Sequence, residues 1–491
     1  MTATISAPLT QTSRSDHLFP TLTPAQVARI AAHGTARHLE PGEVLFDAGE
    51  ANVRFFVVRT GSLEVVGARK KVDEVVTVHR TGQFTGDVGT LSGRRALVRV
   101  RAVEPTEVIE VDRESMLSFV QADADLSEIL MRAFILRRTE LIRNQVSDVV
   151  LMGSRHCAAT LGVKEFLTRN GHPYSYIDLD TDDSVQDLLD RLNVGENDIP
   201  LLICRGSVVL RNPTSRQIAD CLGFNDGIDK TQLRDVVVVG AGPSGLGAAV
   251  YAASEGLDVL VVESRSPGGQ AGASSRIENY LGFPTGISGA DLAARAYTQT
   301  QKFGAQLMIA KGAQRLSCDR TPYAVEIDGG HKIQARAIII ASGAEYRRLP
   351  IENLAQFEGA GVYYGATFLE AQVCKGEEAI VIGGGNSAGQ AAVYLAQTCK
   401  HVQLLVRSGG LAERMSRYLI RRIEDNPGIT VRTHTEVTGL EGETHLQSVV
   451  WRNRLTGETE RRDVGHVFCM MGAAPSTKWL EGCLALDAKG F

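Results

Sequence analysis

The sequence lacks several features that would assign it at once to a class of protein. No apolar run approaches the ~20 residues of a membrane-spanning helix, so we expect no membrane segment. The 491 residues carry a formal net charge of −5, which argues against a general affinity for nucleic acid or anionic membrane. The N-terminus has no charged stretch followed by an apolar core, so no secretory signal is evident.

Cysteine is sparse and unpatterned. The eight cysteines are scattered, with no C-x-x-C pair and no paired spacing. This pattern excludes a disulfide scaffold and a zinc ribbon, and we expect no metal site. It is typical of a reducing cytoplasm, so we predict a cytoplasmic protein.

The clearest motif lies between residues 235 and 245, which read D-V-V-V-V-G-A-G-P-S-G. Four consecutive valines indicate a strand buried on both faces. The G-x-G-x-x-G spacing then permits a tight turn, a close approach of backbone to a pyrophosphate, and a helix N-terminus that favours phosphate. A second strand ends in an acid, whose carboxylate can accept hydrogen bonds from a ribose. The predicted dinucleotide site consists of Gly240, Gly242, Pro243, Ser244, Gly245 and Glu263.

The same unit occurs again further along the chain. A strand-like run leads into G-x-G-x-x-A, and the next strand ends in an arginine where the first unit has an acid. An acid suits a free 2′-hydroxyl and a guanidinium suits a 2′-phosphate, so the first site reads as FAD-like and the second as NADP-like. The second predicted site consists of Gly383, Gly385, Asn386, Ser387 and Arg407. Two dinucleotides in one chain imply an oxidoreductase.

From about residue 234 onward the chain resembles the low-molecular-weight thioredoxin reductases. Besides both fingerprints it carries G-G-Q at 268–270, I-E-N-Y-L-G-F-P-T-G-I-S-G at 277–289, I-I-I-A-S-G-A at 338–344 and M-G-A-A-P-S-T at 471–477. The resemblance implies FAD and NADPH as cofactors, a homodimer, and a hinge at 347–350 between two nucleotide domains. It also places Gly269, Gln270, Asn279, Ser342 and Gly343 beside the flavin.

Two features depart from that family. The family carries C-x-x-C where this sequence reads Gly365-Ala366-Thr367-Phe368, and the nearest cysteine, Cys374, stands alone. Because a flavin reduces a disulfide through a pair of thiols, the electron acceptor is left open. The family also continues beyond the equivalent of Phe491, so we read 476–491 as the start of a truncated return to the flavin domain.

The N-terminal part is rich in short β segments. Between residues 36 and 111 these segments alternate with glycines, which is typical of a β-roll, and we expect one helix over 17–32 before them. The order resembles the cyclic-nucleotide-binding domain family, whose phosphate cassette matches F-T-G-D-V-G-T-L-S-G-R-R-A at 84–96. The resemblance implies a nucleotide pocket at Gly86, Asp87 and Arg95. The alternative is a roll retained for packing or dimerisation.

Residues 146–226 alternate strand and helix in an order that resembles the glutaredoxin/thioredoxin-like fold, with Ile199-Pro200 at that family's cis-proline position. The resemblance implies that Cys157 is a nucleophile, with Thr160 in place of the second cysteine. A helix N-terminus favours the thiolate form of such a cysteine. The alternative is a small residue that happens to begin a helix.

These patterns predict a multidomain chain built from a β-roll, a thioredoxin-like α/β unit and two Rossmann-like α/β domains. The expected boundaries are a disordered tail at 1–15, the roll at 16–145, the thioredoxin-like unit at 146–226, the FAD domain at 227–347 and the NAD(P) domain at 348–475. We expect an FAD-dependent reductase that passes hydride from NADPH to the flavin and then to a thiol/disulfide or other small acceptor. The alternatives are an NAD(P)H oxidase or small-acceptor flavin reductase, and a nucleotide- and redox-sensing protein with little turnover.

Overall fold

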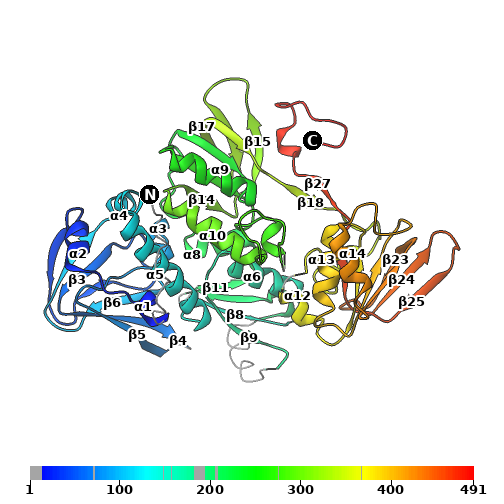
Figure 1. The fold of residues 1–491 in the computed structure, drawn as a ribbon, viewed down its shortest axis with the longest axis horizontal. Helices are drawn as coiled ribbons and strands as arrows, with labels where there is room; N and C mark the ends of the chain where they lie inside the picture. Colours follow the sequence, from blue (N-terminus) through cyan, green and yellow to red (C-terminus); the bar gives the residue numbers. More distant parts are fainter. Residues whose placement is uncertain are drawn as a thin grey trace, which may run out of the picture.

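A computed structural model describes residues 14–69, 72–147, 149–155, 157–181, 194–204, 208–274, 276–366 and 368–490. Most of the predicted tail lies outside these residues. So do 185–192 and 205–206, where the alternation of strand and helix in the thioredoxin-like unit predicts a helix and a hairpin tip. Among the described residues, no helix is both long enough and apolar enough to cross a bilayer. The chain folds into a β-roll at one side, two α/β domains, and a smaller unit between them (Figure 1).

The N-terminus forms two short helices, α1 (Arg14–Leu18) and α2 (Pro24–Ala31). The single helix expected over 17–32 is therefore wrong. Thr23 has extended backbone and caps α2, because its hydroxyl accepts a hydrogen bond from Gln26 N at 3.3 Å and its own N–H donates to Gln26 Oε1 at 2.8 Å. Pro24 at the first helical position disfavours helical backbone at the residue before it.

The β-roll consists of two antiparallel sheets. One has the order β1 (Thr35–Leu39), β7 (Thr106–Val111) and β3 (Phe55–Thr60). The other has β2 (Val44–Phe46), β6 (Val98–Ala102), β4 (Ser62–Arg69) and β5 (Val72–Arg80). Helices α3 (Val88–Ser92), α4 (Arg113–Ala122) and α5 (Ala124–Arg143) complete the unit. Phe55, Phe84 and Phe134 form an aromatic cluster in its core.

The central unit has a four-stranded sheet in the order β11 (Val208–Arg211), β10 (Leu201–Cys204), β8 (Val149–Gly153) and β9 (Ser175–Asp178). Only the pair β8 and β9 is parallel. The alternation of strand and helix predicts helices over 158–169 and 215–222, and α6 (Ala158–Arg169) and α8 (Ser215–Leu222) have these bounds. The 3₁₀ helix η2 (Glu196–Asp198) precedes the cis bond between Ile199 and Pro200.

The first α/β domain has the strand order β14 (Gln306–Ile309), β13 (Val259–Glu263), β12 (Arg234–Val239), β17 (His331–Ile340), β16 (Tyr323–Ile327) and β15 (Ala313–Ser317). The first four strands are parallel. Helix α9 (Pro243–Ser254) connects β12 to β13, and η3 (Ala271–Ala273) and α10 (Gly289–Lys302) follow. The valines of β12 are buried, as expected for a central strand.

The second α/β domain has a parallel sheet in the order β19 (Val362–Tyr363), β26 (Val467–Cys469), β20 (Glu378–Ile382), β21 (His401–Leu405) and β22 (Ile429–Arg432). Helices α11 (Leu354–Phe357), α12 (Phe368–Val373), α13 (Asn386–Leu395) and α14 (Arg417–Glu424) accompany it. The strands β23 (Thr435–Glu441), β24 (Ser448–Asn453) and β25 (Thr459–Arg462) form a separate antiparallel sheet at its outer side (Figure 1).

An antiparallel ribbon of β18 (Ala344–Tyr346) and β27 (Ala473–Pro475) joins the two α/β domains. Beyond it, η4 (Lys478–Leu480) places Trp479 and Leu480 in a core cluster of the first domain. A disulfide between Cys318 and Cys483 ties this last segment to β15. The scattered cysteine spacing gave no indication of that pair.

Side-chain hydrogen bonds and a cation–π contact join the central unit to the β-roll. Arg95 of the roll donates to Asp226 Oδ2 from Nε at 2.9 Å and from Nη2 at 2.5 Å. Arg94 donates to Asn170 O at 2.9 Å, and its guanidinium lies 4.2 Å from the centre of the Phe224 ring. The stretch 225–227, expected as a turn and linker, is thus held by side-chain contacts as well as by backbone turns.

Candidate functional site

The first glycine motif forms a backbone-walled cradle at the N-terminus of α9. Gly240 has φ +104°, and a side chain there would collide with the Ala341 carbonyl. A side chain at Gly245 would collide with the Gly240 carbonyl, so helix and turn are in direct contact. Gly242 begins α9 and lies against Gly269, where an added Cβ would come 2.9 Å from the Gly242 Cα. The cradle therefore consists of N–H groups and glycine Cα atoms with no side chain in the way.

Glu263 ends β13 beside this cradle and is 7% exposed. Its Oε2 accepts a hydrogen bond from Ala241 N at 2.7 Å, and its Oε1 accepts one from Arg265 N at 2.8 Å. Each carboxylate oxygen has a second lone pair, so both can still accept from hydroxyl groups. These two hydrogen bonds, one of them from the glycine-rich turn, therefore fix the orientation of the Glu263 carboxylate beside the predicted phosphate site.

Most of the other residues predicted beside the flavin gather at this end of the sheet. The Gln270 side-chain amide donates to the Ala344 carbonyl. Ser342 lies against Gly240, and Gly343, with φ +69°, accepts a hydrogen bond from Ser476 N at 3.0 Å. Asn279 is exposed on the loop before α10, and within the described ranges no hydrogen bond joins it to this group.

The second glycine motif repeats the geometry at α13. Gly383 has φ +147°, and a side chain there would collide with the Met470 carbonyl. Gly385 begins α13, and an added Cβ would have no heavy atom within 4 Å, so the space in front of the helix is open. Asn386 Oδ1 accepts a hydrogen bond from Ser416 N at 2.7 Å, whereas Ser387 is exposed.

Arg407 is exposed, two residues beyond the end of β21. It lies near Glu436, whose pKa is held below its usual range first by the hydrogen bond from Arg452 and further by the charges of Arg454 and Arg407. Of the basic residues that follow, Arg422 on α14 forms a 3.4 Å ion pair with Glu278 of the first α/β domain. This arginine therefore contacts the other domain.

Cys157 begins α6 in the central unit and is partly exposed. Thr160, one turn later, is fully buried, and its hydroxyl has no hydrogen-bond partner among the described residues. A Cβ at Gly153 would meet Thr160 Cγ2 at 3.0 Å and Pro200 Cβ at 3.2 Å, so the end of β8, the start of α6 and the cis-proline converge. His156, which could assist the thiol, lies outside the described residues.

The first turn of α6 docks on the second α/β domain. A Cβ at Gly359 would lie 2.5 Å from Ala158 Cβ, so the two backbones are in close contact. Leu161 packs against the core cluster of that domain, which contains Tyr363 and Ala366. The start of α6, which Cys157 precedes, therefore lies against Gly359 and a core cluster that includes Ala366.

Cys374 has a thiol neighbour, contrary to our expectation that it stands alone. Its Sγ lies 3.4 Å from the Sγ of Cys399, 25 residues away in the sequence. The positions of the two cysteines relative to the repeated strands could have predicted this contact. Each cysteine shortly precedes a strand of the same parallel sheet, and Glu378 pairs with His401 in the register of those strands.

The predicted nucleotide pocket of the roll is largely filled by the protein itself. The cavity there measures about 100 Å³, below the ~300 Å³ at which ordinary ligand pockets begin. Arg95 is paired with Asp226, as described above. Asp87 caps α3 by accepting from Gly89 N at 2.7 Å and forms a 3.2 Å ion pair with Arg138. Gly86, with φ +101°, packs against Phe134.

Three buried polar atoms of this cavity, Arg94 Nη2, Arg137 Nη2 and His79 Nδ1, nevertheless lack a hydrogen-bond partner among the described residues. Arg137 donates to the carbonyls of Leu18, Phe84 and Gly86, but its Nη2 has no partner among the described residues, and burial lowers the pKa of this guanidinium to about 9. His79 Nδ1 is likewise unpaired among the described residues, and burial lowers the pKa of the imidazole to about 3. The cavity therefore combines a buried cation with a neutral histidine.

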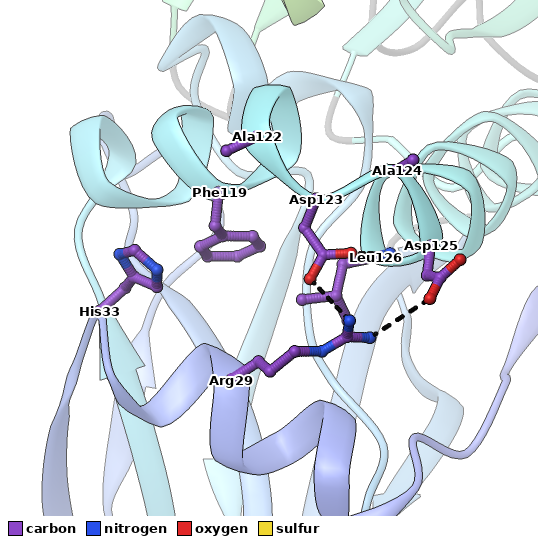
Figure 2. A pocket seen from close by; sticks show the side chains of 8 residues that line it. All are labelled: Arg29, His33, Phe119, Ala122, Asp123, Ala124, Asp125 and Leu126. Atoms are coloured by element: carbon purple, nitrogen blue, oxygen red, sulfur yellow. Dashed lines mark hydrogen bonds and ion pairs between the residues drawn. The ribbon is translucent and has the colours of Figure 1, made fainter.

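A larger, open hollow of about 400 Å³ lies between α2 and the junction of α4 and α5 (Figure 2). Its charged groups are paired with one another, because Arg29 contacts Asp123 at 3.1 Å and Asp125 at 3.7 Å. The ring of His33 lies 5.7 Å from that of Phe119, centre to centre. The three charged side chains of the hollow therefore form one ion-pair cluster. Across the described ranges, no three His, Cys, Asp or Glu side chains gather as metal ligands would.

Comparison with known proteins assigns both ends of the chain. Residues 36–123 match the cyclic nucleotide-binding domain, and residues 234–491 match the pyridine nucleotide-disulphide oxidoreductases. The chain is 34% identical over 259 residues to thioredoxin reductase from Mycolicibacterium smegmatis, which covers 53% of this chain and 82% of that protein. It is 32% identical over 303 residues to NADPH-dependent thioredoxin reductase 3 from Arabidopsis thaliana, which covers 58% of this chain.

That alignment spans about half of the plant protein, 56% of its length. The solved thioredoxin reductase of Lactococcus lactis in its FR conformation matches at a TM-score of 0.49 and 28% identity, covering 52% of this chain and 84% of that one. The model matched by residues 234–491 spans more than half of the chain. The chain belongs to the pyridine nucleotide-disulphide oxidoreductase family.

Proposed function

We propose that the chain is an NADPH-dependent flavoprotein disulfide reductase in which a fused thioredoxin-like unit supplies the reactive thiol. Thioredoxin reductase-like relatives contain FAD and use NADPH. We assign FAD to the domain at 227–347, NADPH to 348–475, the thioredoxin-like fold to 146–226 and the cyclic-nucleotide-binding-like roll to 16–145. The observation that carries the proposal is the docking of the Cys157 helix on Gly359 and on the core cluster that contains Ala366.

The residues at the first cradle fit FAD. Gly240, Gly242 and Gly269 leave backbone N–H groups open to a pyrophosphate, and Glu263 is oriented to accept from ribose hydroxyls. When bound there, FAD supplies a two-electron acceptor for hydride. Gln270, Ser342 and Gly343 would line the far side of the same cradle.

The residues at the second cradle fit NADPH. The open space before Gly385 admits a pyrophosphate at the N-terminus of α13. Arg407 is exposed and can offer its guanidinium to a 2′-phosphate. Glu436 competes for that guanidinium, so the preference for NADPH over NADH rests on this one arginine.

Cys157 supplies the nucleophile at the protein's exit. Its thiolate attacks a disulfide RSSR, forms the mixed disulfide Cys157–S–S–R and releases RS⁻. A thiol of the glutathione class, GSH, then attacks Cys157 Sγ, which gives Cys157–S–S–G and releases RSH. Two electrons that NADPH would supply through bound FAD then cleave Cys157–S–S–G, which restores the Cys157 thiolate and GSH. The overall reaction is NADPH + H⁺ + RSSR → NADP⁺ + 2 RSH, which balances in atoms and electrons. Cys157 precedes the first residue of α6 and is partly exposed, so a small disulfide can approach its Sγ from solvent.

The test is NADPH-dependent reduction of a small disulfide by the flavin-loaded protein, with and without glutathione. Cys157→Ser should lose disulfide reduction while NADPH still bleaches the flavin under anaerobic conditions. Cys221→Ser, a partly exposed cysteine on α8 of the same unit, is the matched control. Full activity of Cys157→Ser would rule out Cys157 as the nucleophile and would favour direct reduction of a small acceptor or of oxygen. Oxygen consumption distinguishes these two acceptors.

A second function is favoured by the unpaired Arg137 Nη2 in the roll. A buried cation with a free donor favours an anionic ligand, and the cavity of about 100 Å³ suits one small group such as a phosphate. We propose that the roll senses a phosphate-bearing ligand, with a whole cyclic nucleotide entering only if Arg95 leaves Asp226. Thermal-shift measurements with inorganic phosphate and with 3′,5′-cyclic AMP separate the two sources, and no shift with either would retire this function.

A further inference from the structure

Two thiols of the second α/β domain meet at the amino-terminal edge of its parallel sheet. Cys374 directly follows α12, and Cys399 lies four residues beyond the end of α13. Their Sγ atoms are 3.4 Å apart. The glycine motif at 383–385 follows the carboxyl end of β20, so this pair lies at the opposite edge of the sheet from the nucleotide site.

The backbone holds the two thiols in register. Gly376 N donates to Thr398 O at 2.9 Å, and Lys400 N donates to Glu377 O at 2.8 Å. These two bonds continue directly into the pairing of β20 with β21, which begins at Glu378 and His401. An S–S bond is about 2.05 Å long, so bond formation requires the sulfurs to close by a little over 1 Å, which side-chain torsions can supply.

The two thiols have different environments. Cys374 is fully buried, whereas Cys399 is partly exposed. The hydrogen bond between them lowers the pKa of Cys399 and, together with burial, raises the pKa of Cys374. The exposed sulfur is therefore the better nucleophile, and the buried one is positioned behind it as the resolving thiol.

We propose that Cys374 and Cys399 form a reversible dithiol/disulfide site that exchanges with small disulfides of the glutathione class. The Cys399 thiolate attacks one sulfur of RSSR, forms the mixed disulfide Cys399–S–S–R and releases RS⁻. Cys374 loses its proton to solvent and attacks Cys399 Sγ, which breaks the mixed disulfide and releases the second RS⁻. The protein loses two electrons and two protons, and RSSR becomes two RSH.

The experiment equilibrates the folded full chain in glutathione redox buffers of increasing oxidised fraction. Acid quenching, alkylation of the remaining thiols and proteolysis then identify the state of each cysteine by mass spectrometry. Wild type should yield a linked pair of Cys374 and Cys399 peptides, two hydrogen atoms lighter than the free thiols together. Cys374→Ser should instead accumulate a glutathione adduct on Cys399, and Cys399→Ser should leave Cys374 unmodified because that thiol is buried.

If Cys374→Ser fails to fold, Cys374→Ala replaces it. The linkage measured in wild type tests the proposal without either variant. Protein unfolded in urea is the positive control for reagent and detection. A wild type whose two peptides stay unlinked in every redox buffer overturns the proposal, as does linkage that appears only in urea. The readout needs neither cofactor nor Cys157, so it is independent of the reductase proposed above.

Discussion

Gly359→Ala should undock the Cys157 helix from the second α/β domain. Gly359 has φ +78°, and an added Cβ would lie 2.5 Å from Ala158 Cβ and 3.1 Å from Ala158 Cα. Carbon atoms pack best at about 3.5–4.0 Å, so the first turn of α6 must retreat by about 1 Å. Gly457 has φ +76° in the same domain, and an added Cβ there meets nothing within 4 Å. Gly457→Ala therefore reproduces the backbone strain without the collision.

The magnitude follows from the difference between the two variants. Left-handed backbone costs each alanine about 1–2 kcal/mol, and this cost cancels in the comparison. Two costs remain, the collision with Ala158 and the loss of packing around Leu161. Full burial of a leucine stabilises by ~1.5–3 kcal/mol, so the half-buried Leu161 should contribute about 1 kcal/mol. A total of about 1–2 kcal/mol raises the undocked population roughly 5–30-fold.

The assay is the rate at which an alkylating reagent modifies Cys157 in the native protein. Gly359→Ala should react faster than Gly457→Ala, with about 5–30-fold as the upper bound because the partly exposed Cys157 also reacts in the docked state, and its NADPH-dependent disulfide reduction should fall while flavin bleaching is unchanged. Equal alkylation rates in the two variants would refute the docking argument. Equal disulfide reduction with unequal alkylation would separate docking from catalysis.

Three further predictions concern the cofactor sites and the buried histidines. Gly240→Ala should purify without flavin absorbance because its Cβ has no room against Ala341; a yellow protein contradicts this. Arg407→Ala should raise KM for NADPH by about tenfold and leave KM for NADH unchanged, since only the 2′-phosphate loses a partner; equal effects on both contradict it. Burial keeps His79 and His172 neutral with pKa values of about 3, so the stability they contribute is present above about pH 6.5 and falls by about 2 kcal/mol each at pH 5, where the unfolded chain is protonated. Denaturant melts of His172→Asn should show a shallower loss over that range.

The sequence was most informative where structure is decided locally. The buried valines of β12 and the glycines that follow required nothing beyond the period of a strand and the sterics of a tight turn. Helices α6 and α8 have the expected bounds for the same reason. The helix expected over 17–32 was wrong because proline lacks a backbone N–H donor: Pro20 and Pro24 interrupt the stretch, and α2 begins only at Pro24.

The sequence was least informative about contacts between distant residues. Cys318 and Cys483 are 165 residues apart and belong to segments that meet only after the chain has returned to the first α/β domain. Cys374 and Cys399 meet because their strands are adjacent, a relation that the repeated fingerprint could have revealed. Arg95 was expected to bind a phosphate, and the presence of Asp226 beside it depends on how the central unit is placed against the roll.

The central unit contacts both the roll and the second α/β domain. Arg94 and Arg95, adjacent in sequence, both point out of the roll, one to Asn170 and Phe224 and the other to Asp226. At the far side of the same unit, α6 docks on Gly359. A ligand that draws Arg95 into the roll would have to break the Asp226 ion pair, and the redox step proposed at Cys157 would act on the same unit. If the roll binds a ligand and the unit carries electrons as proposed, linkage requires any coupling between the two to be reciprocal.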